Sequence, residues 1–284
     1  MLSFINSIIL GVVEGVTEFL PVSSTGHLTI AEKLMHLPID DPGLTAYTAI
    51  IQVGAMLAAI IYFWKDIVRI VAGWFTGLGN KAKRGADYNM GWAVIAGTMV
   101  TVVIGLLGKD LITGPLRSMW VVAGGLILWS FAMFWADRYE ARTPQSEKKT
   151  LDDITWKHGL ILGFMQCLAL VPGVSRSGAT IVGGLGVAGL DRLAATKLSF
   201  YLGIPALVGA GIYEAASEFS HVSNTVGWGV TGVGTLVSFI VAYASIAWLL
   251  KFVASNTFTS FVIYRIVAGL AIIGLLLGGV VTAQ

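Results

Sequence analysis

Two acidic residues lie inside an apolar segment near the start of this 284-residue chain. Glu14 and Glu18 are four residues apart, so on a helix their carboxylates share one face. A carboxylate inside a membrane-spanning segment costs about 2.5–3.5 kcal/mol, and acids retained there are functional by default. The pair could hold a hard divalent cation or act as a base and its partner. Alternatively, one or both face water at a helix end or stay protonated within local hydrogen bonds.

A short run of hydroxyl groups follows the acidic pair and ends in an imidazole. Ser23, Ser24 and Thr25 precede a glycine, and His27 lies within one helical turn of all three hydroxyls. A hydroxyl next to a base is the usual arrangement of an activated nucleophile. The hydroxyls are therefore candidates for a nucleophile and for phosphate ligands. A single histidine in an apolar segment can also be a packing residue that is held by hydrogen bonds.

A second polar run surrounds Arg176, which lies among small residues in the middle of another apolar stretch. The planar guanidinium suits phosphate oxygens, and neighbouring hydroxyls and amides would form an anion-binding nest at a helix start. The alternative is an arginine that extends to the membrane interface. The candidate phosphate-binding residues of this run are Ser175, Arg176, Ser177, Gly178 and Thr180.

The composition predicts that these residues lie in a membrane protein. Hydrophobic residues make up 56% of the chain and charged residues 12%, against about 25% charged in soluble domains. The mean hydropathy is +0.80. A net charge of +2, with basic residues dispersed over loops, argues against a nucleic-acid partner. The single cysteine, Cys167, excludes an internal disulfide framework.

Apolar runs long enough to cross a bilayer, which takes about 20 residues, occur six times. They are 46–64, 91–108, 119–135, 198–213, 227–250 and 258–281. Basic residues concentrate in the loops 65–84 and 138–157, which are predicted to be cytoplasmic. The segment 214–226 has no Lys or Arg and is predicted to lie outside, as is the C-terminus. Arg265 and Lys251 flank the last spans and are expected to be interface anchors, with pairing of Arg265 to an acid as the alternative.

Two further apolar stretches, 4–35 and 159–190, are interrupted by Pro/Gly/Ser clusters at 21–26 and 172–178. With six spans, both basic loops lie on one side of the membrane only if each broken stretch enters and leaves the membrane on the same side. We therefore predict two re-entrant helix–loop–helix pairs, because irregular backbone at membrane depth is tolerated only inside protein or along a watery cavity. The alternative is two ordinary kinked spans for each stretch.

Short matches in the same order suggest an internal duplication. They pair Gly11 with Gly159, Gly54 with Gly203, Gly97 with Gly234 and Gly124 with Gly269. We predict a single integral membrane domain, 1–284, that is an all-α polytopic protein with repeat halves of about 1–140 and 150–284. Each half would cross the membrane an odd number of times, so the second half would be inverted relative to the first. The turns of the two re-entrant pairs would then meet near the midplane, with helix N-termini facing a shared, anion-binding cavity. Glycine-rich faces would allow a homodimer without requiring one.

The two polar runs carry a resemblance to a known family. The segments 11–27, GVVEGVTEFLPVSSTGH, and 172–180, PGVSRSGAT, resemble the signatures of bacterial undecaprenyl-pyrophosphate phosphatases of the bacitracin-resistance type. The similarity covers essentially the whole chain. It implies hydrolysis of the polyprenyl pyrophosphate lipid to the monophosphate and inorganic phosphate, which recycles the carrier for peptidoglycan and confers bacitracin resistance. It also implies a multi-pass protein of the bacterial inner membrane with a site open to the periplasm.

The resemblance also implies roles for individual residues. Glu14 and Glu18 match the family's acidic pair, which is associated with Mg²⁺ or Ca²⁺. Ser24 and His27 match its nucleophile and acid/base, Arg176 belongs to its phosphate-binding run, and Ser23 and Thr25 are expected to add hydroxyls. The residues alone leave open whether Glu18 or His27 activates Ser24, or whether His27 activates a water.

Two other functions are compatible with part of this pattern. Inverted repeats with broken helices are typical of transporters, so a flippase for a polyprenyl phosphate or another anion is the main rival. A transporter needs only to bind and release its anion. Ser24 beside His27, together with an acidic pair, would be unnecessary for that and favours a catalyst. A lipid phosphatase of the type 2 phosphatidic-acid superfamily is disfavoured, because that superfamily's Lys/Arg-Pro element is absent from this sequence.

Overall fold

The computed structural model describes residues 2–39, 41–108, 118–217 and 226–283, and within them the chain is helical throughout, without β-strands. This confirms the all-α class. The helices are α1 (Phe4–Thr17), α2 (Ser24–Leu34), α3 (Pro42–Tyr62), α4 (Trp64–Gly79), α5 (Ala86–Leu107), α7 (Met119–Arg142), α8 (Trp156–Cys167), α9 (Arg176–Gly186), α10 (Arg192–Ser217), α12 (Trp228–Val253) and α13 (Thr259–Leu277). Short 3₁₀ helices are Lys81–Lys83, Gln145–Glu147, Leu151–Asp153 and Leu168–Leu170.

Five helices among the described residues, α3, α5, α7, α12 and α13, are long and apolar enough to cross a membrane. They correspond to five of the six expected spans, which makes the chain a multi-pass membrane protein. The sixth expected span, 198–213, falls in α10, which contains Pro205 and is not among those five. The count of six crossings therefore stays a prediction. The expected outer segment 214–226 lies largely outside the described residues.

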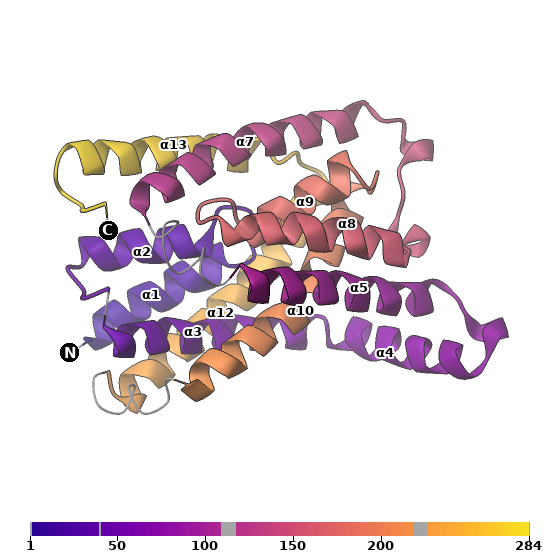
Figure 1. Cartoon of the computed structure of the whole chain (residues 1–284), viewed down its shortest axis with the longest axis horizontal. Coiled ribbons are helices and arrows are strands. Elements are labelled where there is room, and N and C mark those ends of the chain that lie inside the picture. The colour runs from indigo at the N-terminus through magenta and orange to yellow at the C-terminus, as the bar shows by residue number, and fades with distance from the viewer. Residues whose placement is uncertain (1, 40, 109–117, 218–225, 284) are drawn as a thin grey trace.

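The two interrupted stretches form helical hairpins. α1 and α2 extend from the end of the molecule that holds both termini, and α8 and α9 extend from the opposite end, so the two turns face each other in the middle (Figure 1). These helices have 14, 11, 12 and 11 residues, too few for any of them to cross a bilayer alone. The hairpins therefore favour re-entrant pairs over ordinary kinked spans.

Close backbone contacts join the first half of the chain to the second. A Cβ atom at Gly11 on α1 would meet the carbonyl of Gly234 on α12, and one at Gly159 on α8 would meet the carbonyl of Ala93 on α5. Glycine lets these helices approach without an intervening side chain. Each broken hairpin thus packs against a long helix of the other half, as an interleaved repeat requires. The division into repeat halves itself stays a prediction.

Most of the expected cytoplasmic loop 65–84 is instead a helix, α4, which follows α3 after a break at Phe63. The expectation of a loop was wrong because the apolar residues of this segment recur at helical spacing. α4 packs against α5, where Gly91 accommodates the Trp74 ring and Arg69 forms an ion pair with Asp87 at 2.8 Å. The basic residues after α4 remain in the short connection to α5.

The α4–α5 and α7–α8 connections lie at the end of the molecule opposite both termini (Figure 1). Arg69 on α4 and Asp87 in the first turn of α5 line one surface cavity together with Thr150 and Asp152 from the α7–α8 connection. The two basic segments are therefore on the same side of the helical bundle, as the charge pattern predicted.

Candidate active site

The two hairpin turns touch each other inside the protein. The Ser177 hydroxyl at the start of α9 donates to the carbonyl oxygen of Leu20 in the first turn, at 3.0 Å. Ser23 and Ser175, which immediately precede α2 and α9, both have φ of 76°. This backbone conformation is strained for a residue with a Cβ and is typical of functional sites. The turns therefore place the starts of two helices at a single point.

A serine, a carboxylate and a guanidinium meet at this point. The Ser24 hydroxyl donates to Oε2 of Glu18 at 2.6 Å. Nη2 of Arg176 lies 3.5 Å from Oε1 of the same carboxylate. Glu18 is therefore placed to accept the serine proton, while Arg176 provides positive charge next to both groups. All three side chains come from the two predicted motifs.

The guanidinium of Arg176 is held by α10. It lies against Gly203, where any Cβ atom would collide with it, and its Nη1 donates to the carbonyl oxygen of Ser199 at 3.4 Å. Its Nε is buried and has no hydrogen-bond partner in the described part of the chain. Arg176 therefore keeps a donor that an incoming phosphate oxygen could use.

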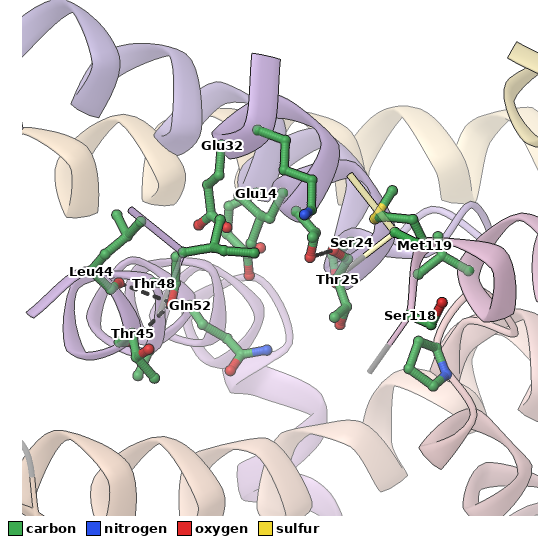
Figure 2. Close-up of a pocket in the computed structure, with 18 residues that line it drawn as sticks. Glu14, Ser24, Thr25, Glu32, Leu44, Thr45, Thr48, Gln52, Ser118 and Met119 are labelled. Carbon is green, nitrogen blue, oxygen red and sulfur yellow. Dashed lines mark hydrogen bonds between the residues drawn. The ribbon is translucent and has the colours of Figure 1, made fainter. Parts of the chain in front are cut away.

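A cavity of about 290 Å³ opens beside Ser24 (Figure 2). It lies at the end of the molecule that holds the termini, because residues 118–119 and Ala283 form part of its wall. Its polar lining comes chiefly from α1, α2 and α3. The polar residues in question are Glu14, Ser24, Thr25, Thr29, Glu32, Lys33, Thr45, Thr48, Gln52 and Ser118.

Glu14 is the main unsatisfied group of this cavity. Its side chain is only 1% exposed, and neither carboxylate oxygen has a hydrogen-bond partner in the described residues. Figure 2 shows its carboxylate next to that of Glu32, with the Gln52 amide on the adjacent helix α3. Leaving a buried carboxylate without partners is costly, so a ligand is expected there.

These oxygen donors fit a hard divalent cation. The described residues contain no group of three or more His, Cys, Asp or Glu that could hold a metal by themselves. Mg²⁺ commonly takes one or two carboxylates and completes its shell with water and substrate phosphates. Glu14, with Glu32 and Gln52 nearby, meets that requirement. Glu18, by contrast, is engaged by Ser24 and Arg176.

His27 does not reach the Ser24 hydroxyl in this structure. Its Nδ1 lies 2.8 Å from the carbonyl oxygen of Ser23, and its Nε2 lies 2.7 Å from the hydroxyl of Tyr264 on α13. The imidazole does not line the cavity, and neither do Glu18 and Arg176, which lie behind Ser24. Ser24 is paired with Glu18 instead, so the geometry favours the carboxylate as its base.

The hydroxyls of the second motif form hydrogen bonds within the protein. Ser175 caps α9 by accepting from the Gly178 amide at 3.2 Å and pairs with Ser177 at 3.1 Å. Thr180 pairs with the Ser199 hydroxyl on α10 at 2.5 Å. The Gly178 amide, a predicted phosphate donor, is thus already used within the helix cap, and the amides of Arg176 and Ser177 remain the candidate anion donors of this run. Among the predicted phosphate-binding hydroxyls other than Ser24, Thr25 lines the cavity, and Ser23 is buried in the turn.

The sequence analysis did not single out several residues of this region. Glu32 and Gln52 line the cavity, and Tyr264 contacts His27. A third acid within the apolar stretch 4–35 was the available signal for Glu32. Arg265 was expected to be an interface anchor, and this was wrong, since it is fully buried. Nor does it pair with an acid among the described residues; it binds backbone carbonyls of both turns.

The fold and the site together define a class: a polytopic membrane protein with residues suited to phosphoryl transfer at the junction of two broken helical hairpins. Comparison with known proteins assigns the chain to one family within this class. Residues 7–271 match the family model described as bacitracin resistance protein BacA, and the chain belongs to this family.

Similar proteins of bacteria match nearly the whole chain. A protein of Cutibacterium acnes named undecaprenyl-diphosphatase is 53% identical over 99% of this chain and 100% of its own length. One of Streptomyces coelicolor, named undecaprenyl-diphosphatase 1, is 53% identical over 97% of this chain and 96% of its own. One of Frankia casuarinae, named undecaprenyl-diphosphatase 3, is 48% identical over 99% and 100%. The family resemblance noted in the two motifs is thereby confirmed.

Proposed function

We propose that this protein hydrolyses undecaprenyl pyrophosphate to undecaprenyl phosphate and inorganic phosphate. Family membership and relatives named undecaprenyl-diphosphatase support the reaction and its substrate. The observation that carries the proposal is the 2.6 Å hydrogen bond from Ser24 to Glu18, next to Arg176 and beside a polar cavity. Binding and release of an anion would not require such an activated hydroxyl.

The arrangement favours a two-step reaction. Glu18 accepts the proton of Ser24 as the serine Oγ attacks the terminal phosphorus of the pyrophosphate, and the bridging P–O bond breaks to release undecaprenyl phosphate. Arg176 and the first amides of α9 stabilise the charge on the transferred group. Glu18 passes the Ser24 proton to the departing undecaprenyl phosphate and then takes a proton from the water that attacks the phosphoserine. The P–Oγ bond breaks, Glu18 returns the proton to Ser24, and inorganic phosphate leaves. Thr25, on the cavity wall, is placed to bind a phosphate oxygen.

We also propose that a divalent cation, Mg²⁺ or Ca²⁺, assists this reaction. The unpartnered carboxylate of Glu14, with oxygens of Glu32 and Gln52 nearby, would hold it. When bound, the cation would neutralise charge on the pyrophosphate. The sequence predicted that Glu14 and Glu18 would share the cation; we propose Glu14 as its main ligand instead, because Glu18 is already engaged by Ser24 and Arg176.

The active site is proposed to face the periplasm or cell exterior. The cavity lies at the end opposite the basic connections, and basic loops favour the cytoplasm. Hydrolysis on that side would return the carrier lipid for envelope synthesis. More enzyme would leave less pyrophosphate lipid on the surface, in keeping with the family's description as bacitracin resistance proteins.

The purified protein in detergent is expected to release phosphate from undecaprenyl pyrophosphate in a cation-dependent manner. EDTA should lower the rate at least about tenfold, and added Mg²⁺ or Ca²⁺ should restore it, since the cation neutralises substrate charge. Malachite-green detection of phosphate measures the rate, and protein with both Ser24→Ala and Arg176→Ala serves as the blank. Absence of release under every cation condition would contradict the proposal and favour a transporter.

The proposed orientation predicts where an impermeant thiol reagent can reach. In a Cys167→Ser background, Pro38→Cys at the exposed α2–α3 connection should be labelled in intact cells by a sulfonated maleimide. Lys81→Cys at the exposed α4–α5 connection should be labelled only after permeabilisation. Labelling is measured by the mass shift of the purified protein. The opposite pattern would place the cavity on the cytoplasmic side.

A further inference from the structure

Arg265 is an arginine buried in the membrane domain without a carboxylate. It lies within the apolar helix α13 and is the largest fully buried side chain of the described residues, with 0% exposure. No Asp or Glu forms an ion pair with it in the described part of the chain. Burying a guanidinium without a carboxylate partner costs several kcal/mol, so an arginine retained at this position is expected to have a function.

The guanidinium binds both hairpin turns at once. Nη1 donates to the carbonyl oxygen of Pro21 at 2.9 Å, and Nη2 donates to that of Gly173 at 2.9 Å. Pro21 lies three residues before Ser24, and Gly173 lies three residues before Arg176. The two acceptors therefore occupy equivalent places in the two turns, and one rigid, planar group fixes them relative to each other.

The same side chain is also attached to α7. Its Nε donates to the Ser130 hydroxyl at 3.3 Å, and Nη2 contacts the carbonyl oxygen of Gly125 at 3.3 Å. A Cβ atom at Gly125 would meet the carbonyl of Pro172, so the second turn lies directly against the α7 backbone. α7 thus supports the second turn directly and the first turn through Arg265.

We propose that Arg265 is a positioning residue that sets the distance between Ser24 and Arg176. Within the described residues Arg265 forms no hydrogen bond with either side chain; it acts through the backbone that carries them. An error of about 1 Å between reacting groups can lower a rate about 10²-fold. The inference rests on the roles proposed above for Ser24, Glu18 and Arg176.

The test compares Arg265→Lys and Arg265→Met with wild type, using undecaprenyl pyrophosphate and protein purified in detergent. Lysine keeps the charge, but its single nitrogen cannot reproduce the fork that binds both turns. We expect kcat to fall about 100-fold in both variants, with KM changed less than about threefold. Inhibition by orthovanadate, a phosphate mimic, should weaken at least about tenfold. Arg138→Met is the matched control, because Arg138 is an exposed arginine of α7.

Thermal unfolding and circular dichroism report the folded fraction, so that kcat refers to folded protein only. A folded Arg265→Lys protein with wild-type kcat would overturn the proposal, as would a loss confined to KM. Failure of both variants to fold would also overturn it and assign Arg265 to fold stability. If Ser24→Ala keeps full turnover while the Arg265 variants lose it, the proposed nucleophile is wrong but the alignment of the turns stands.

Discussion

Replacing Arg176 with alanine is expected to lower kcat/KM for undecaprenyl pyrophosphate by about 10³-fold or more. A guanidinium placed at the transferred phosphoryl group is worth about 10³–10⁵ in rate in comparable sites. Here Arg176 is the cation adjacent to the Ser24–Glu18 pair, and its buried Nε has no partner among the described residues. Arg176→Lys should recover only a small part of the rate, because an ammonium lacks the planar fork.

The measurement is phosphate release at saturating cation, with the folded fraction checked by size-exclusion chromatography and thermal unfolding. Arg138→Ala, which removes an exposed arginine, is the control and should leave the rate unchanged. Turnover near the wild-type level in folded Arg176→Ala would rule out the proposed phosphate clamp. The anion would then have to be bound by the helix N-termini and the cation alone.

The membrane class and the broken hairpins could be predicted because their causes are local. Apolar length specifies a span, and a Pro/Gly/Ser cluster inside an apolar stretch specifies a break, whichever partners the segment later packs against. The segment 64–79 shows the limit of this reasoning. Its charges suggested a loop, although its apolar residues recur at helical spacing; what the sequence does not reveal is that α5 covers the apolar side of α4.

The contact between Ser24 and Glu18 was among the alternatives that the sequence offered, because one motif contains both residues, whereas contacts with distant helices were missed. Ser24 and Glu18 are six residues apart, and both were identified from their motif. Arg265 contacts Pro21, which is 244 residues away, and Gly173, which is 92 residues away. Spacing along the chain cannot reveal contacts of that kind. His27 shows the converse: it is close to Ser24 in sequence, but its ring turns to Tyr264 on α13.

Glu18→Gln and Glu14→Gln are expected to fail in different ways, and this difference separates a base from a cation ligand. Glu18 accepts the Ser24 hydrogen bond at 2.6 Å, so replacing its carboxylate with an amide should remove the base and lower kcat about 10²–10⁴-fold. The Mg²⁺ dependence of the Glu18→Gln rate should stay close to that of wild type. Glu14 has no protein partner among the described residues, so Glu14→Gln should instead raise the Mg²⁺ concentration for half-maximal rate at least about tenfold.

Initial rates over a Mg²⁺ titration measure both effects, and Glu147→Gln, at an exposed residue far from the cavity, is the control. Ser24→Ala completes the set: it should lower kcat about 10³-fold or more and abolish the phosphoserine that acid quenching and mass spectrometry would trap in the wild type. A Glu18→Gln enzyme whose main defect is Mg²⁺ affinity would make Glu18 a cation ligand. The base would then have to be found elsewhere, and His27 would need to rotate away from Tyr264 to serve.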